Sequence, residues 1–338
     1  MHNNKRNIIS QFTSMVLGII LVNIVFSSCE RIYEDLDPCP HGVSLRFIYD
    51  YNMEYANAFP KKVDCLTLLI YDDKGNYVDT RIVTGTELQD ENYRMKLDLK
   101  KGNYHFVAYG GLACEKSSFL MNHTPKGGTQ YTDLRVELDE ECLTNPLRKN
   151  LHGLYWGELI LATADLYSEG TVEMMKNTNN VRIVLQQMSG EPVDDKDFEF
   201  EITDDNTLFN YDNNLLANGM VTYTPWSQGQ VSAGVTDDEQ EVIAAYAELS
   251  ISRLMVSDWH SPQLKIRRKS DGKDIVDIPL INYLLMLKSD LYASMESQEF
   301  LDRESEWSMI FFLSPNLEWI KTYIKINDWT VRINNIGQ

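Results

Sequence analysis

The chain has 338 residues, a length more typical of two domains than of one. Hydrophobic residues make up 43% of it and charged residues 24%, which argues for a folded, water-facing protein and against a disordered or polytopic membrane chain. The formal net charge of −19 disfavours a nucleic-acid partner, because an acidic surface repels phosphate groups. The sequence carries no nucleotide-binding, zinc-hydrolase or nucleophile-elbow motif, so we expect no enzyme.

The N-terminus reads as a targeting segment. Two basic residues precede an apolar stretch at residues 15–26, which is too short to span a bilayer and is typical of a signal-peptide core. The stretch ends in Phe26-Ser27-Ser28-Cys29, and small residues before a cysteine there resemble a bacterial lipobox. We therefore expect a lipoprotein signal peptide over residues 1–28 and a mature chain that begins at Cys29, with diacylglycerol on its sulfur and an acyl chain on its amine. The alternatives are an ordinary signal peptide with a chance cysteine and an uncleaved anchor helix.

Residues 29–41 are polar and contain two prolines, so we expect a tether between the lipid and the folded body. Strand patterns begin after it. Residues 45–49 alternate, whereas residues 63–71 are almost continuously apolar, as in a strand covered on both faces or in a sandwich core. The turn-rich residues 72–76 connect that strand to another at 77–83, which predicts a hairpin. Further strands are predicted at residues 93–99, 104–109, 134–138, 155–162 and 171–175.

The polar residues 176–180 predict a domain boundary, with an N-terminal β-sandwich at 42–178 and a C-terminal β-sandwich at 179–338. An apolar tract at residues 280–287 has helical length and predicts a buried helical insertion in the second domain. Short strands with turn residues between them favour an all-β fold of two tandem Greek-key sandwiches. The strands predicted in the second domain are 181–188, 198–203, 220–224, 242–256, 264–268, 275–279, 307–313, 319–326 and 329–333.

Four cysteines remain if Cys29 carries lipid, and an exported protein can form disulfides. Cys65 lies inside the apolar strand at 63–71, and we interpret it as a buried free thiol. Cys39, Cys114 and Cys142 lie in loop-like contexts, so one bridge among them is expected. We predict Cys39 with Cys114, and Cys142 is the alternative partner.

In order along the chain, several segments resemble the FimB-type anchor branch of the fimbrillin superfamily, the minor lipoproteins of type V pili in Bacteroidales. The longest are VDCLTLLIYD at residues 63–72, KGNYHFVAYGG at 101–111 and AELSISRL at 247–254. Shorter ones lie at residues 34–39, 43–51 and 326–329. No segment is diagnostic alone, but their order, the lipobox and the length together are specific.

This resemblance implies two transthyretin-like β-sandwiches on a lipid anchor in the outer membrane, exposed at the cell surface. Such a protein fixes the base of a fimbria and limits its length. The expected partners are outer-membrane lipid, through Cys29, and a fimbrial stalk subunit that joins by β-strand addition. No nucleic acid, metal or small-molecule cofactor is expected.

The predicted joint is a sheet edge or the C-terminal strand, because the lipidated N-terminus cannot be removed without losing the anchor. In an extended segment from Tyr323 to Ile333, alternate residues would share one side. They are Tyr323, Lys325, Asn327, Trp329, Val331 and Ile333. The alternative is that this segment is the last hairpin of the second sandwich.

A surface glycan-binding lipoprotein is the rival hypothesis, because the six tryptophans could stack on sugar rings. Exposed, coplanar tryptophans would favour that role, whereas buried ones would favour the pilus anchor. The histidines show no metal-ligand spacing, and no nucleophile stands beside a base, so neither a metal site nor a catalytic site is expected.

Overall fold

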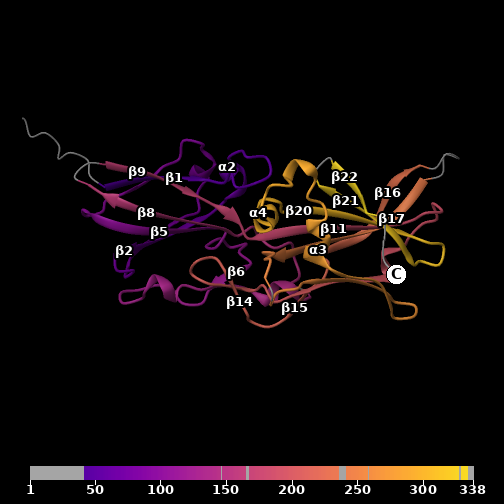
Figure 1. Ribbon diagram of the computed structural model, residues 1–338. Coiled ribbons are helices and arrows are strands. Elements are labelled where there is room, and N and C mark those ends of the chain that lie inside the picture. The colour runs from indigo at the N-terminus through magenta and orange to yellow at the C-terminus, as the bar shows by residue number, and fades with distance from the viewer. Residues whose placement is uncertain are drawn as a thin grey trace, which may run out of the picture. The chain divides into compact units, whose positions relative to one another are not determined.

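The computed structural model describes residues 42–145, 147–164, 167–235, 241–257, 259–326 and 329–333. Cys29, Cys39 and the predicted tether lie outside these residues. The N-terminal half, residues 42–177, contains two sheets (Figure 1). The β1 sheet has the order β4 (Met95–Leu97), β1 (Gly42–Ile48), β9 (Tyr167–Glu173), and its β1–β9 pair is parallel. The strands of the β2 sheet are, in order, β10 (Met175–Lys176), β8 (Tyr155–Thr163), β5 (Gly102–Gly110), β2 (Leu66–Asp72) and β3 (Tyr77–Val83).

Strand β2 is covered on both faces, as its apolar sequence predicts. Leu66, Leu68 and Ile70 belong to a buried cluster with side chains of β1. Leu69 and Tyr71, which alternate with them, belong to a second cluster that extends into the C-terminal half. Burial on both faces explains why the strand carries no alternation of polar and apolar residues.

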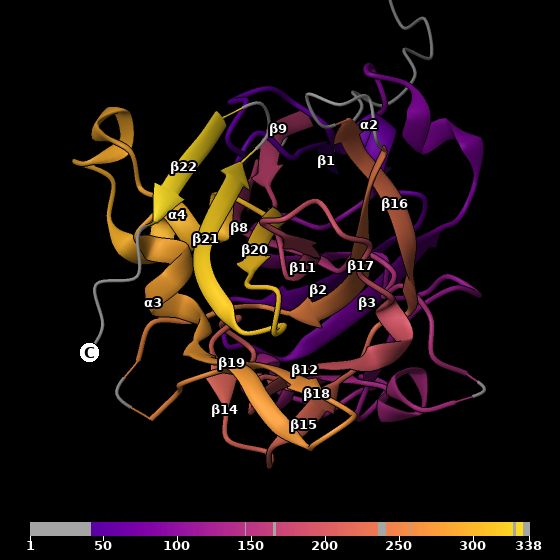
Figure 2. The same cartoon turned by 90° about the vertical axis from the view of Figure 1, so that its right-hand side faces the viewer.

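The C-terminal half, residues 178–333, contains a second sandwich, whose two sheets face each other in Figure 2. The strands of the β11 sheet are, in order, β16 (Ser227–Val235), β17 (Glu241–Ser252), β11 (Thr178–Gln187), β20 (Glu306–Leu313), β21 (Trp319–Ile326) and β22 (Trp329–Ile333). Those of the β12 sheet are β15 (Val221–Tyr223), β12 (Phe198–Asp204), β18 (Gln263–Arg268) and β19 (Lys273–Pro279). Val181, Ile183, Phe200 and Ile266 fill the core between these sheets.

A fifth sheet joins the two halves. Its strand order is β14 (Leu215–Leu216), β13 (Leu208–Phe209), β7 (Val136–Leu138), β6 (Phe119–Met121), so it takes strands from both sides of residue 178. Residues 42–338 accordingly form one compact unit. The boundary at residue 178 stays a prediction. It separates the other four sheets, but this joining sheet and the buried cluster around it cross the boundary.

Helices are short and few among the described residues. The α-helices are α2 (Phe59–Lys62), α3 (Leu280–Leu285) and α4 (Ser297–Arg303). The 3-10 turns cover Thr86–Gln89, Tyr131–Asp133, Glu140–Leu143, Asp195–Asp197 and Asp290–Tyr292. Helix α3 buries Leu280, Ile281 and Leu284, which confirms the predicted helical insertion. The all-β class with β-sandwich domains is also confirmed.

Within the described residues, no helix is both long and apolar enough to cross a membrane.

Candidate functional site: the closing hairpin and the junction of the two halves

The chain closes in a hairpin, so a single extended strand from Tyr323 to Ile333 was wrong and the alternative, a last hairpin of the second sandwich, is confirmed. Strands β21 and β22 are antiparallel, and their pairing runs from Ile326 with Trp329 to Thr322 with Ile333. Tyr323 and Lys325 therefore lie on one strand, whereas Trp329, Val331 and Ile333 lie on the next; Asn327 falls outside the described residues. The two residues between the strands, Asn-Asp, are types that favour tight turns.

Strand β22 is the last strand of the β11 sheet. It pairs with β21 on one side, and on its other side no strand lies against it among the described residues. An edge strand presents unpaired N–H and C=O groups, to which an extended segment of another chain can add. Strand β16 forms the opposite edge of the same sheet.

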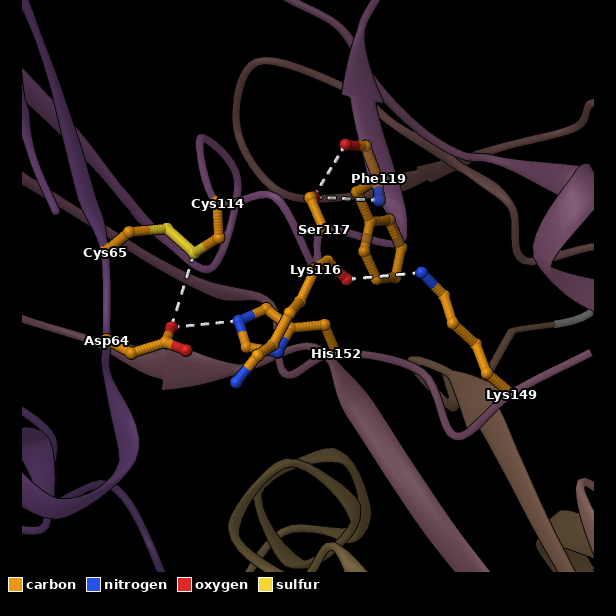
Figure 3. The surroundings of a disulfide bond; sticks show 8 residues. All are labelled: Asp64, Cys65, Cys114, Lys116, Ser117, Phe119, Lys149 and His152. Carbon is orange, nitrogen blue, oxygen red and sulfur yellow. Dashed lines mark hydrogen bonds and ion pairs between the residues drawn. A yellow bond between two sulfur atoms is a disulfide. The ribbon is translucent and has the colours of Figure 1, made fainter. Parts of the chain in front are cut away.

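The disulfide joins Cys65 to Cys114, with 5.8 Å between their Cα atoms (Figure 3). The predicted pairing of Cys114 with Cys39 or Cys142, and the free thiol at Cys65, were therefore wrong. Strands β2 and β5 are antiparallel neighbours in which Leu66 pairs with Gly110, so the loop after β5 returns to the start of β2. Cys142 is buried and free.

Asp64 and His152 lie beside this disulfide, with 2.9 Å between Asp64 Oδ1 and His152 Nε2 (Figure 3). Together with Cys114 they bring metal-ligand types within 4.8 Å of one another. The Cys114 sulfur is bonded to Cys65 and is not a thiolate, so only a carboxylate and an imidazole remain. Two ligands fall short of the three or four protein groups that zinc sites use, so this trio does not fit a metal centre.

A buried hydrogen-bond network crosses the junction between the halves. Asn177, at the end of the N-terminal half, exchanges side-chain hydrogen bonds of 2.6 and 3.1 Å with Asn213. Arg253 donates to the Asn213 carbonyl oxygen and, over 2.8 and 2.7 Å, to both carboxylate oxygens of Asp302 in α4. Gln298 donates to the same carboxylate. The guanidinium and carboxylate are thus both paired, as buried charges require.

Aromatic stacking adds a second link at this junction. The Arg303 guanidinium of α4 lies 4.0 Å from the centre of the Tyr51 ring and 4.7 Å from that of Tyr55. Both tyrosines belong to the loop between β1 and α2 in the N-terminal half. Each contact is a favourable cation–π arrangement. Arg303 therefore joins the α4 segment directly to the first half, whereas Asp302 of α4 is bonded to Arg253 within the second half.

The comparisons with known proteins identify the family. The model for the fimbrillin-A associated anchor proteins Mfa1 and Mfa2 matches residues 36–335, which is most of the chain. The chain belongs to this family. Family membership supports a role as a fimbrial anchor or adhesin at the cell envelope. No curated protein matches the sequence.

Solved structures agree with this anchor family. A candidate adhesin from Bacteroides thetaiotaomicron VPI-5482 is 86% identical over 89% of this chain and 100% of its own, with a TM-score of 0.85. A candidate polysaccharide-binding protein from the same strain is 29% identical over 88% and 100%, with a TM-score of 0.74. The fimbrial anchor protein Mfa2 from Porphyromonas gingivalis is 16% identical over 87% and 99%, with a TM-score of 0.63, and at this identity the likeness shows the fold alone.

The tryptophans of this anchor-family chain do not form a platform among the described residues. Trp307 is buried, and Trp156 and Trp319 are partly buried against the core. Trp226 and Trp259 are exposed, at 38% and 49%, but no described ring contact joins them. Glycan binding through stacked tryptophans therefore stays a prediction.

The sequence patterns did not predict that Arg253 and Asp302 form a buried ion pair. Arg253 stands at the end of the apolar strand pattern of β17, and a lone charge in such a place was the one available signal of a buried partner. Its partner Asp302 lies 49 residues further along the chain, in an ordinary polar segment. Nothing in the spacing of the two residues points to their contact.

Proposed function

We propose that this protein fixes the base of a fimbria to the outer membrane and limits the length of the fibre. The observation that carries the proposal is the match of the anchor-protein family over residues 36–335. The acidic, β-sandwich body is compatible with a surface structural role. Its junction is held by a buried network and by stacking, so a load applied to one half reaches the other through side-chain contacts as well as the backbone.

The membrane attachment is assigned to Cys29. The motif Phe26-Ser27-Ser28-Cys29 after an apolar core supports cleavage before the cysteine and lipid on its sulfur and amine. Each buried methylene of a lipid contributes about 0.8 kcal/mol, so two or three acyl chains hold a protein firmly where one chain does not.

The joint with the first stalk subunit is assigned to the β22 edge of the β11 sheet. An incoming strand would continue the sheet, with main-chain hydrogen bonds supplying affinity and alternate side chains supplying register. The edge position of β22 in the β11 sheet supports this assignment.

Cells that lack the gene are expected to make fibres that are abnormally long or shed into the medium, because nothing would stop growth or hold the base. Electron microscopy of the cells, with the culture medium fractionated alongside, measures both effects. Restoring the gene should return short, cell-bound fibres. Fibres that stay attached and of normal length in the deleted strain would remove the anchoring role.

Deleting residues 329–338 is expected to abolish co-purification of the protein with its stalk subunit, because the deletion removes β22 and with it the proposed joining edge. Deleting residues 334–338 alone is the matched control and should preserve the complex. Circular dichroism verifies that both truncated proteins fold. A folded protein that ends at residue 328 and still co-purifies at the normal level would refute the β22 assignment.

A further inference from the structure

A polar hollow of about 580 Å³ opens at the junction of the two halves, next to the disulfide. Four lysines from separate segments line it: Lys62 at the end of α2, Lys116 after Cys114, Lys149, and Lys176 in β10. The volume lies in the range of pockets that hold small ligands. Four lysines around one hollow are unusual in a chain whose net charge is −19.

The lining of this hollow carries an excess of positive charge, with four lysines against two glutamates, Glu115 and Glu306. Glu306 is paired with Lys176, with 3.2 Å between its Oε1 and Lys176 Nζ, and it also accepts hydrogen bonds from the Asn180 side chain. Lys62 and Lys116 have no acidic partner among the described residues. Burial lowers the pKa of Lys176, and the positive charge of Lys62 lowers it further, although Glu306 opposes both effects. A bound anion would relieve the repulsion between the ammonium groups of Lys62 and Lys176.

Covalent and polar contacts hold the walls of the hollow in place. The disulfide fixes Cys114, two residues before Lys116, and Lys149 donates a hydrogen bond to the Lys116 carbonyl oxygen over 3.4 Å (Figure 3). His152, which also lines the hollow, bonds to Asp64 through its ring and to the Ser118 hydroxyl through its backbone N–H. A site built in advance loses less entropy when a ligand binds.

We propose that this hollow binds an acidic sugar, with Lys62 and Lys116 holding its carboxylate or sulfate group. Lysine ammonium groups act as point charges and bind oxyanions without demanding one geometry. Asn150 and Tyr155 line the same hollow and offer an amide and a hydroxyl to the sugar hydroxyls. A volume of this size fits one or two sugar rings rather than a folded partner. The site uses none of the tryptophans and does not depend on the anchoring role.

The test is calorimetric titration of the full-length protein, purified in detergent, with a sulfated disaccharide, a uronic-acid disaccharide and a neutral disaccharide. Both acidic sugars are expected to bind, and the neutral one is not. Lys62→Gln is expected to weaken binding about tenfold or more, because it removes a charged hydrogen-bond donor. Lys61→Gln is the matched control: Lys61 is the preceding residue of α2, is exposed and does not line the hollow, so affinity should not change.

Three results would overturn the proposal. The first is that neither acidic sugar binds, and the second is equal affinity in the Lys62→Gln and Lys61→Gln variants. The third is binding of inorganic sulfate alone as tightly as the sulfated disaccharide, which would mean an ion site and not a sugar site. None of these outcomes bears on fibre attachment, so the anchoring role succeeds or fails separately.

Discussion

Replacing Asp302 with alanine is expected to lower the free energy of unfolding by about 3–5 kcal/mol, because it leaves the buried Arg253 guanidinium without its carboxylate. Arg253 and Asp302 are only 8% and 6% exposed, and two hydrogen bonds join them. Water cannot replace the lost partner without opening the junction. Chemical denaturation followed by tryptophan fluorescence measures the change. Trp307 is a suitable reporter, since it is buried and its ring contacts Phe300 of α4.

The pair of Arg268 and Asp271, whose carboxylate is exposed, provides the matched control. It has the same paired geometry, with Arg268 donating to both carboxylate oxygens, but Asp271 is 46% exposed in the hairpin between β18 and β19. Water and salt screen an exposed pair, so Asp271→Ala should leave the unfolding midpoint nearly unchanged. If Asp302→Ala and Asp271→Ala lower the free energy of unfolding equally, burial does not explain the contribution of the Arg253–Asp302 pair to stability.

Replacing Cys29 with alanine is expected to abolish lipid attachment and move nearly all of the protein out of the membrane fraction. The reason is that the proposed acyl chains on Cys29 are what attaches the protein to the membrane. Incorporation of labelled palmitate and fractionation of cell envelopes measure the two effects. Cys39→Ala, ten residues further along, is the control and should keep both lipid and location. Palmitate that still enters the Cys29→Ala protein would refute the lipobox interpretation.

Strand positions were largely predictable from the sequence, because burial leaves a local pattern. The strand at 63–71 was recognised from its continuous apolar residues, and the structure covers β2 on both faces. Strand β16 was not predicted. It is an edge strand of Ser, Gln, Gly and Val that is exposed along much of its length, so no core imposes an alternating pattern on it.

Contacts between residues that lie far apart in the sequence were not predictable. The alternation of residues 323–333 fits one long strand as well as the two strands predicted at 319–326 and 329–333, and the pairing of Ile326 with Trp329 decides for the hairpin. The Cys65–Cys114 bridge depends on the pairing of β2 with β5, and the lysines of the junction hollow come from four segments that no spacing rule connects. Family resemblance, by contrast, predicted the fold class and the family itself.

The parallel pairing of β1 with β9 has a mechanical consequence. If tension enters at Gly42 and leaves through β9 toward β11, it pulls the two strands past each other along their length, so all of their hydrogen bonds share the load. The pair β11–β20 repeats this arrangement for a force that leaves toward β21 and β22. Antiparallel hairpins pulled at their open ends would instead unzip one bond at a time. The order of strands along the chain thus suits the proposed role, in which the protein would be stretched between a membrane and a fibre.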